Sequence, residues 1–235
     1  MNIKNFFRQT GLNLILILML TSLCILTFNN EIKSVFAPNS DNLYYKGDIS
    51  KNNISLMINV YWGNEYLPNM LQTLEEHNIR TTFFIGGMWA SKYPEELLKI
   101  HSQNHEIANH GYFHKDHNNL SYEDNQKEIM NTHNIIKEYT SLNMTLFAPP
   151  SGSFNDYTLQ VAQNLGYKVI MWSKDTIDWR DQDVDLIYKR ATSKLSNGDL
   201  ILMHPTLCTA LALPKIIEYC QQNNFNIVPV SNVIN

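Results

Sequence analysis

From residue 51 onward, short apolar runs alternate regularly with segments whose apolar residues recur at helical spacing. The apolar runs have strand length and are ISLMINVY, TTFFIG, HEIANH, MTLFAP, YKVIMW, GDLILMH and FNIVPV. Amphipathic segments such as YLPNMLQTLEEHN and SYEDNQKEIMNTHNIIKEY lie between them. About seven strand–helix units in this order are typical of a parallel sheet with helical crossovers.

The length of the chain limits how far this sheet can close. The chain has 235 residues, and a complete eight-unit barrel of strands and helices typically takes about 250. We therefore predict an α/β domain over residues 51–235, a distorted and incomplete (β/α) barrel of about seven parallel strands. The net charge of −4 offers no basic surface, so nucleic acid is not expected as a partner.

The first 30 residues have a different character. Lys4 and Arg8 precede the apolar run GLNLILILMLTSLCILTF, and no charged residue occurs from Gln9 to Asn30. This span is long enough to cross a bilayer as a helix, with the basic end kept inside. We predict a signal anchor at 1–30, a polar linker at 31–50 and a single-pass membrane protein whose domain lies outside the cytoplasm. The alternative is a cleaved signal peptide, with VFA at 35–37 as its site, and a secreted product.

Polar residues stand where several of the predicted strands end. They are Asn59, His110, Asp175, His204 and the APPSG loop that contains Ser151. The carboxyl ends of parallel barrel strands meet at one mouth, where such proteins carry their active sites. We therefore expect these residues, with His114, to line one cleft.

Half of the 8 histidines occur in the stretch HEIANHGYFHKDH. His110 and His114 are four residues apart, a spacing that can aim two imidazoles at one divalent metal. The same spacing also arises by chance, as in His101 and His105. A hydrogen-bonded or solvent-exposed pair is therefore the alternative interpretation.

The order of these motifs resembles that of the polysaccharide deacetylases, the NodB-homology family also known as carbohydrate esterase family 4. HEIANHGYFHKD is similar to the family's H-E-I-G-N-H-[ST]-x-x-H-x-D block, and FAPPSGSFN to F-R-P-P-Y-G. WSKDTIDW resembles W-x-x-D-x-x-D-W, LILMH resembles the final L-x-H, and TTFFIGG resembles T-F-F-x-x-G. The resemblance covers nearly all of residues 51–235, and the loop NVYWGNEYLPNM is most similar to the sporulation-type branch.

The resemblance implies a divalent metal, usually zinc, and removal of the N-acetyl group from an amino sugar. His110 and His114 would bind the metal. His204 would be the general acid that protonates the leaving amine, since its ordinary pKa suits that task. Asp175 or Asp178 would orient His204, as a carboxylate does in hydrolytic triads.

Five further residues are predicted to bind substrate. The backbone N–H of Ser151 would donate to the developing oxyanion, and Pro150 belongs to the same block. Trp179 and Trp62 would line the sugar groove, as would Trp172. Packing in the core is the alternative for the tryptophans.

The first family block, T-F-D-D-G, is altered in this chain. The position of the base is Asn59, the position of the third metal ligand is Val60, and the arginine that pairs with the base is Ala148. An asparagine cannot act as a base near neutral pH, and valine offers no donor atom. Because an arginine without its aspartate would be an unpaired and partly buried charge, we interpret Asn59 and Ala148 as a matched replacement.

A third metal ligand therefore has to come from elsewhere. Glu65 is the first candidate, and Asn64, the amide oxygen of Asn59 or a water are others. Asp116 and His117 lie near the histidine pair in sequence. Glu65 can equally be a solvated residue at the start of the following helix, where a carboxylate is favoured.

The sequence thus predicts a metal-dependent hydrolase that removes N-acetyl groups from the amino sugars of a cell-wall or surface polysaccharide. The alternative is a catalytically inactive family member that binds glycan or organises wall synthesis. A third possibility is a hydrolase that acts on a different acyl group.

Overall fold

The computed structural model describes residues 13, 17–22 and 42–235. It divides into two units, Met1–Asn39 and Ser40–Asn235, and each is considered by itself. Residues 13 and 17–22 are helical, but most of the predicted membrane helix and the whole VFA site lie outside the described residues. Within the described ranges, no helix is both long and apolar enough to cross a bilayer.

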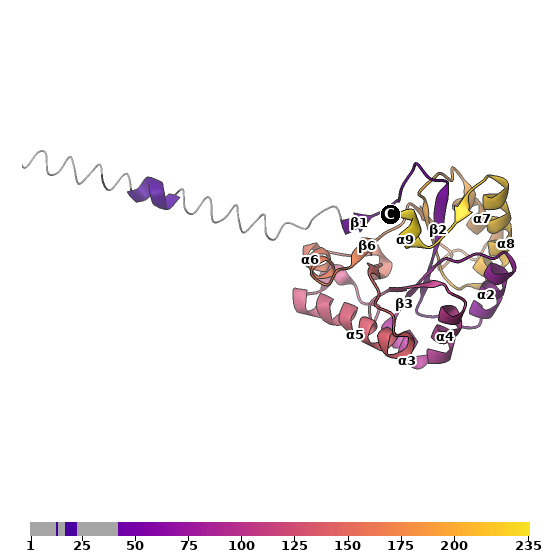
Figure 1. Ribbon diagram of the computed structural model, residues 1–235, viewed down its shortest axis with the longest axis horizontal. Helices are drawn as coiled ribbons and strands as arrows, with labels where there is room; N and C mark the ends of the chain where they lie inside the picture. The colour runs from indigo at the N-terminus through magenta and orange to yellow at the C-terminus, as the bar shows by residue number, and fades with distance from the viewer. Residues whose placement is uncertain (1–12, 14–16, 23–41) are drawn as a thin grey trace, which may run out of the picture. The chain divides into compact units, whose positions relative to one another are not determined.

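One nine-stranded sheet organises the second unit (Figure 1). Its strands follow the order β1-β6-β5-β4-β3-β2-β8-β7, with β9 paired to β2, and all of these pairs are parallel. The strands are β1 (Leu43–Tyr44), β2 (Asn53–Val60), β3 (Thr82–Ile85), β4 (Glu106–Asn109), β5 (Leu146–Phe147), β6 (Lys168–Ile170), β7 (Lys174–Asp175), β8 (Leu200–Met203) and β9 (Asn226–Ile227). Because β1 and β7 end the order without pairing to each other, the barrel is incomplete, as predicted.

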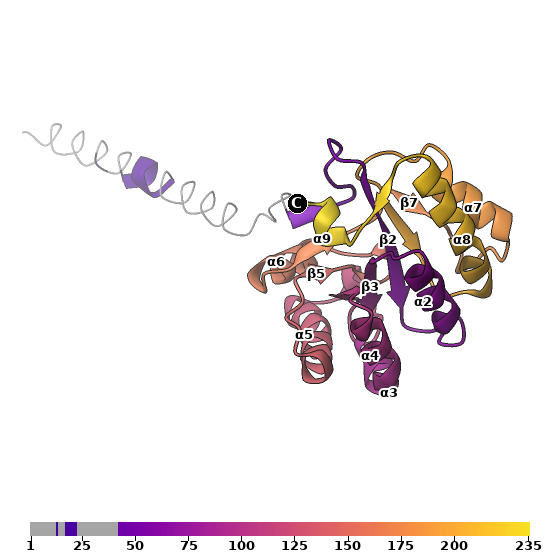
Figure 2. The same ribbon diagram turned by 45° about the vertical axis from the view of Figure 1, so that its right-hand side comes forward.

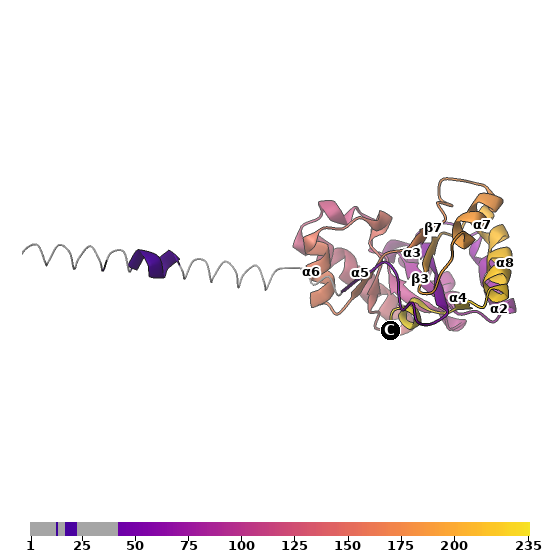
Figure 3. The ribbon, with the colours of Figure 1, turned by 90° about the horizontal axis from the view of Figure 1, so that it is seen from above.

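The longer helices surround the sheet on its outer side (Figure 2). They are α2 (Leu67–Glu76), α3 (Gly87–Lys92), α4 (Pro94–Ser102), α5 (Tyr122–Thr140), α6 (Asp156–Asn164), α7 (Val184–Thr192) and α8 (Leu207–Gln222), with the short α9 (Val230–Val233) near the C-terminus. Figure 3 shows α5 and α6 on one flank and α2, α7 and α8 on the other. Ser121 caps α5 by accepting a hydrogen bond from the Asp124 N–H.

Side chains alternate between two apolar cores along the strands. On β2, Ile54, Leu56, Ile58 and Val60 point outward into the large core that the helices complete. Met57 points inward to a smaller core, which Val230 and Val233 of α9 also join. Asn59 follows Met57 by two residues and therefore shares the inner face, at the carboxyl end of the strand.

The sheet has two more strands than predicted, and it begins earlier. Strand β1 lies within residues 31–50, which we predicted as linker, yet it pairs with β6, and Lys46 forms a bridge to Asp199. The linker prediction is therefore wrong for its last residues. Strands β1 and β7 have two residues each, so no alternation of polar and apolar residues could reveal them.

Candidate functional site

A cavity of about 260 Å³ opens at the carboxyl ends of the strands. Its lining brings together residues that lie far apart in the sequence: Asn59, Tyr61, His110, His114, Ser151, Trp172, Asp175, Trp179, Leu202 and His204. All six residues expected to share a cleft line it, so that prediction is confirmed. We refer to this cavity as the cleft.

His110 is held in one tautomer at the floor of the cleft. Its Nδ1–H donates to the carbonyl oxygen of Ala148 over 2.7 Å, and a carbonyl can only accept. The lone pair is therefore on Nε2, which is buried without a hydrogen-bond partner. Burial, with a contribution from His114, keeps the pKa of His110 well below its ordinary value. The ring is thus neutral and carries a free lone pair, as a metal ligand requires.

His114 lies on a loop that a buried carboxylate fixes in place. Glu128 of α5 accepts hydrogen bonds from the N–H groups of Tyr112 and Phe113 at 2.9 and 2.7 Å. His114 itself has a φ of 55°, which turns the chain at this point. Its ring centroid lies 5.2 Å from that of His110, with an interplanar angle of 70°.

These side chains fit a divalent metal with neutral ligands. Two imidazoles that share a zinc ion at Zn–N distances of about 2.0–2.1 Å have centroids roughly 5 Å apart, close to the separation here. Asn59 adds a buried amide oxygen, Oδ1, that has no hydrogen-bond partner. No group of three His, Cys, Asp or Glu side chains within the described ranges is arranged to hold a metal. Among the side-chain oxygens that line the cleft in the described part of the chain, Asn59 Oδ1 is the one that is buried without a hydrogen-bond partner.

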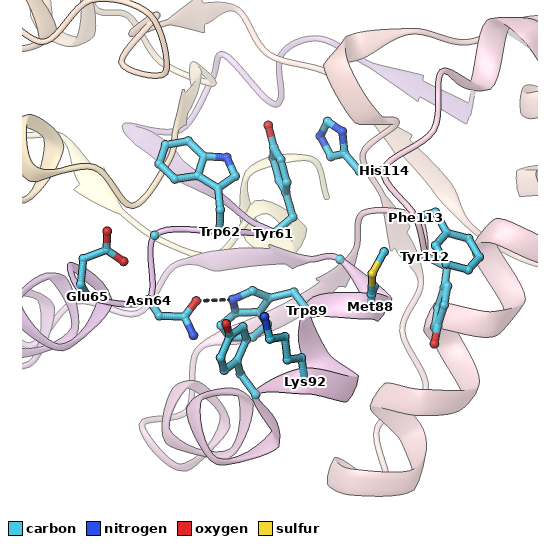
Figure 4. Close-up of a pocket in the computed structure, with 13 residues that line it drawn as sticks. Tyr61, Trp62, Asn64, Glu65, Met88, Trp89, Lys92, Tyr112, Phe113 and His114 are labelled. Atoms are coloured by element: carbon cyan, nitrogen blue, oxygen red, sulfur yellow. Dashed lines mark hydrogen bonds between the residues drawn. The ribbon is translucent and has the colours of Figure 1, made fainter.

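The other candidate ligands lie elsewhere. Glu65 and Asn64 line a neighbouring cavity of about 450 Å³ and not the cleft (Figure 4). Asn64 Oδ1 accepts from the indole N–H of Trp89 at 2.6 Å. Asp116 caps the short turn His117–Asn119, and His117 pairs through Nδ1 with Asn125 Oδ1 at 2.6 Å. The structure therefore does not support Glu65, Asn64 or Asp116 as the third ligand, because each lies outside the cleft.

His204 is oriented by Asp178 and not by Asp175. Asp178 is only 1% exposed. It accepts from His204 Nδ1–H at 2.8 Å, from the His204 N–H at 2.6 Å and from Thr209 Oγ1 at 2.6 Å. Asp175 lines the cleft instead and accepts from the Ile177 N–H at 2.8 Å. The hydrogen bond to Asp178 places a proton on His204 Nδ1. His204 Nε2 is therefore the nitrogen that can accept a proton or donate one to a ligand.

The predicted substrate-binding residues occupy different parts of the site. Ser151 lines the cleft with a φ of 55°, whereas Pro150 is buried and does not line it. Trp179 lines the cleft and is 56% exposed, so it is available to a ligand. Trp62 stacks parallel to His204, with centroids 6.1 Å apart, and lines the neighbouring cavity.

Trp172 was considered either as a residue of the sugar groove or as a core residue, and its position combines the two. Its ring lines the cleft and also packs against the inner core.

Neither Val60 nor Ala148 lines the cleft. Val60 is fully buried in the outer core, so it points away from the cleft. Ala148 is fully buried in the inner core. Asp175 is the only carboxylate that lines the cleft in the described part of the chain.

Sequence reasoning missed three residues that shape the site. Glu128 of α5 and Thr209 of α8 are buried hydrogen-bonding partners that lie outside the quoted motifs. Tyr61 comes directly after β2, and its ring stacks on His114 with centroids 3.7 Å apart. The sequence could have indicated Tyr61, because it directly follows a predicted strand whose end lies at the cleft.

Comparison with known proteins agrees with this geometry. The family model described as polysaccharide deacetylase matches residues 46–170. Protein YlxY of Bacillus subtilis is 35% identical over 190 residues, which cover 81% of this chain and 60% of that protein. A peptidoglycan-N-acetylglucosamine deacetylase of Bacillus cereus is 27% identical over 162 residues, 69% of this chain and 59% of that enzyme. This chain thus spans less than two thirds of either relative.

Among solved structures, BA3943 of Bacillus anthracis, described as a CE4 family pseudoenzyme, is similar to this chain. It is 33% identical with a TM-score of 0.81, and the match covers 85% of this chain and 70% of that one. A mutant of BA3943 is described as having restored enzymatic activity. Because the family model matches more than half of its residues, the chain belongs to the polysaccharide deacetylase family.

Proposed function

We propose that the cleft binds an N-acetylated amino sugar of a cell-wall or surface polysaccharide with a divalent metal, and that it removes the acetyl group only slowly. One observation carries this proposal. Asn59, with its unpartnered Oδ1, stands in the same cleft as His110, His114 and the His204–Asp178 pair. In this proposal the site would have the metal-binding and acid groups, but Asn59 offers no base at its position.

The chain's own residues have distinct tasks in this proposal. His110, His114 and Asn59 would hold the metal, which when bound supplies Lewis-acid polarisation of the acetamido carbonyl. The Ser151 N–H would donate to the carbonyl oxygen as that oxygen gains negative charge. His204 would give its proton to the leaving nitrogen, and Asp178 would stabilise the imidazolium before that transfer.

The loss of the base sets the expected rate. The Asn59 amide cannot accept a proton from an attacking water. General acid–base catalysis by one group typically contributes about 10²–10⁴-fold. We therefore expect acetate release to be slower than in a deacetylase with an aspartate at this position by a factor in that range.

The test measures binding, metal content and acetate release on the full chain. We expect wild-type protein to retain one zinc ion after dialysis, to bind N-acetylglucosamine oligomers and to release acetate slowly. His110→Ala should lose the zinc and the acetate release, whereas Asp116→Ala, outside the cleft, is the matched control and should keep both. A wild-type protein that binds no oligomer with zinc present would overturn the proposal.

The second candidate is an inactive domain that binds glycan without hydrolysing it. The loss of both base and arginine, Asn59 and Ala148, favours it, as does the similarity to a protein described as a pseudoenzyme. The same assay separates the two. Oligomer binding with acetate release no higher than that of His110→Ala would select this candidate.

We also propose that the N-terminal segment holds the domain at the outer face of the cell membrane. Support comes from Lys4 and Arg8 ahead of the charge-free span from Gln9 to Asn30. Cleavage and secretion remain the alternative, and cell fractionation distinguishes them.

A further inference from the structure

Two cavities meet at a wall made of two stacked rings. The cleft of about 260 Å³ and its neighbour of about 450 Å³ share Tyr61 and His114 in their linings. The ring of Tyr61 lies against that of His114 with centroids 3.7 Å apart and an interplanar angle of 28°. Figure 4 shows the two rings side by side at one edge of the larger cavity. The pair therefore divides one depression into two.

The Tyr61 ring lies close to the rings of four other residues. Besides His114, its ring lies 5.9 Å from that of His110, and it meets His204 edge-on at 6.4 Å and Trp62 edge-on at 6.0 Å. In the described part of the chain its hydroxyl has no hydrogen-bond partner, and the side chain is only half-buried. A ligand ring can replace a stacking contact of this kind, so rotation of Tyr61 would remove the wall at the cost of its contact with His114.

The larger cavity has the chemistry of a sugar site. Aromatic side chains from helix α3 and from the loops around it line this cavity, namely those of Trp62, Trp89, Tyr93, Tyr112 and Phe113. Lys92 and Asn64 add polar groups at the same cavity, and Figure 4 shows Asn64 bonded to the Trp89 indole. Aromatic faces with a few polar groups are typical of sites for small polar-rimmed ligands. A pyranose ring has apolar faces and a rim of hydroxyls, which match this lining.

We propose that Tyr61 is a movable divider that sets how many sugar rings the site accepts. With Tyr61 on His114, the cleft is smaller than the roughly 300–1,000 Å³ of typical ligand sites and holds a single ring. With Tyr61 turned away, the two cavities form one groove, in which a neighbouring ring of the same polymer lies on the aromatic walls. This inference rests on the proposed function, that the cleft binds an N-acetylated sugar.

Chain-length dependence of binding tests the divider. The zinc-loaded full chain is titrated with N-acetylglucosamine and with its β-1,4-linked tetramer, and the ratio of the two dissociation constants is compared among variants. Tyr61→Ala removes the ring that separates the two cavities, and Tyr61→Val removes it while keeping a larger side chain. Tyr61→Phe keeps the ring. Tyr157→Ala removes an exposed tyrosine of α6 and is the matched control.

We expect Tyr61→Ala and Tyr61→Val to raise the preference for the tetramer by about tenfold, because neither variant has to displace the stacked ring. Tyr61→Phe and Tyr157→Ala should keep the wild-type ratio. Binding of both sugars with the same ratio in all folded variants would overturn the divider and leave the proposed function intact. Absence of any sugar binding, in wild type and variants alike, would overturn both.

Discussion

Replacing Asp178 by asparagine probes the most heavily hydrogen-bonded side chain of the site. The carboxylate accepts three hydrogen bonds, two from His204 and one from Thr209, at 2.6–2.8 Å. Asparagine has nearly the same shape, but an amide group replaces one acceptor oxygen by a donor. At least one of the three donors would then face another donor inside the protein.

The size of the effect follows from burial and from the number of bonds. A hydrogen bond to a charged group is worth about 1.5–3 kcal/mol, and a buried donor left unsatisfied costs more. Because Asp178 is 1% exposed and accepts three such bonds, we take about 3–5 kcal/mol as the cost of losing its charge. For a domain of this size, about 1 kcal/mol corresponds to roughly 2–4 °C in Tm, so we expect a fall of about 6–20 °C.

Thermal unfolding followed by circular dichroism measures this fall. Asp175→Asn is the matched control, since Asp175 is half-buried and accepts one bond, from the Ile177 N–H. We expect that control to lose no more than about 4 °C. An Asp178→Asn protein as stable as the Asp175→Asn protein would refute the buried network and with it the assignment of Asp178 as the residue that orients His204.

Three further predictions concern other parts of the chain. Asn59→Asp alone should not restore fast acetate release, because the carboxylate would lack its arginine, and Ala148→Arg alone should lower Tm, because it buries an unpaired charge. The double variant should exceed the sum of the two effects on Tm and on acetate release, and additive effects would contradict a coupled pair. Burial and the charge of Arg80 lower the pKa of His105 from 6.5 to about 4. As the pH falls, the His105 of the unfolded chain is protonated before that of the folded chain. The free energy of unfolding therefore decreases between pH 6.5 and 4, by up to about 3 kcal/mol. His105→Gln should lose less Tm than wild type between pH 7 and 5, and an equal loss would show that another group is responsible. Finally, full-length protein should be found in the washed membrane pellet, whereas a soluble extracellular form that begins near Pro38 would show signal cleavage.

Much of the architecture could be predicted from the sequence because it depends on local periodicity. The alternation of Ile54, Leu56 and Ile58 with Met57 and Asn59 identifies β2 as a strand with two differently packed faces. The alternation of strands and helices then requires parallel pairing. Parallel pairing in turn brings the strand ends together, which is why the residues of the cleft could be named in advance.

Only the tertiary structure decided which of these residues interact and how. Asp175 and Asp178 are equivalent in sequence, but the bonds from His204 and from Thr209 on α8 single out Asp178. Glu65 lies just past Asn59 in the chain, yet it lines the other cavity and not the cleft.

Tyr61 had no motif to mark it, and its contact with His114 joins residues from two different strand ends. Hydrogen bonds and ring contacts of this kind depend on side-chain directions across strands and helices that are distant in sequence. The periodicity of a single segment carries no information about those directions.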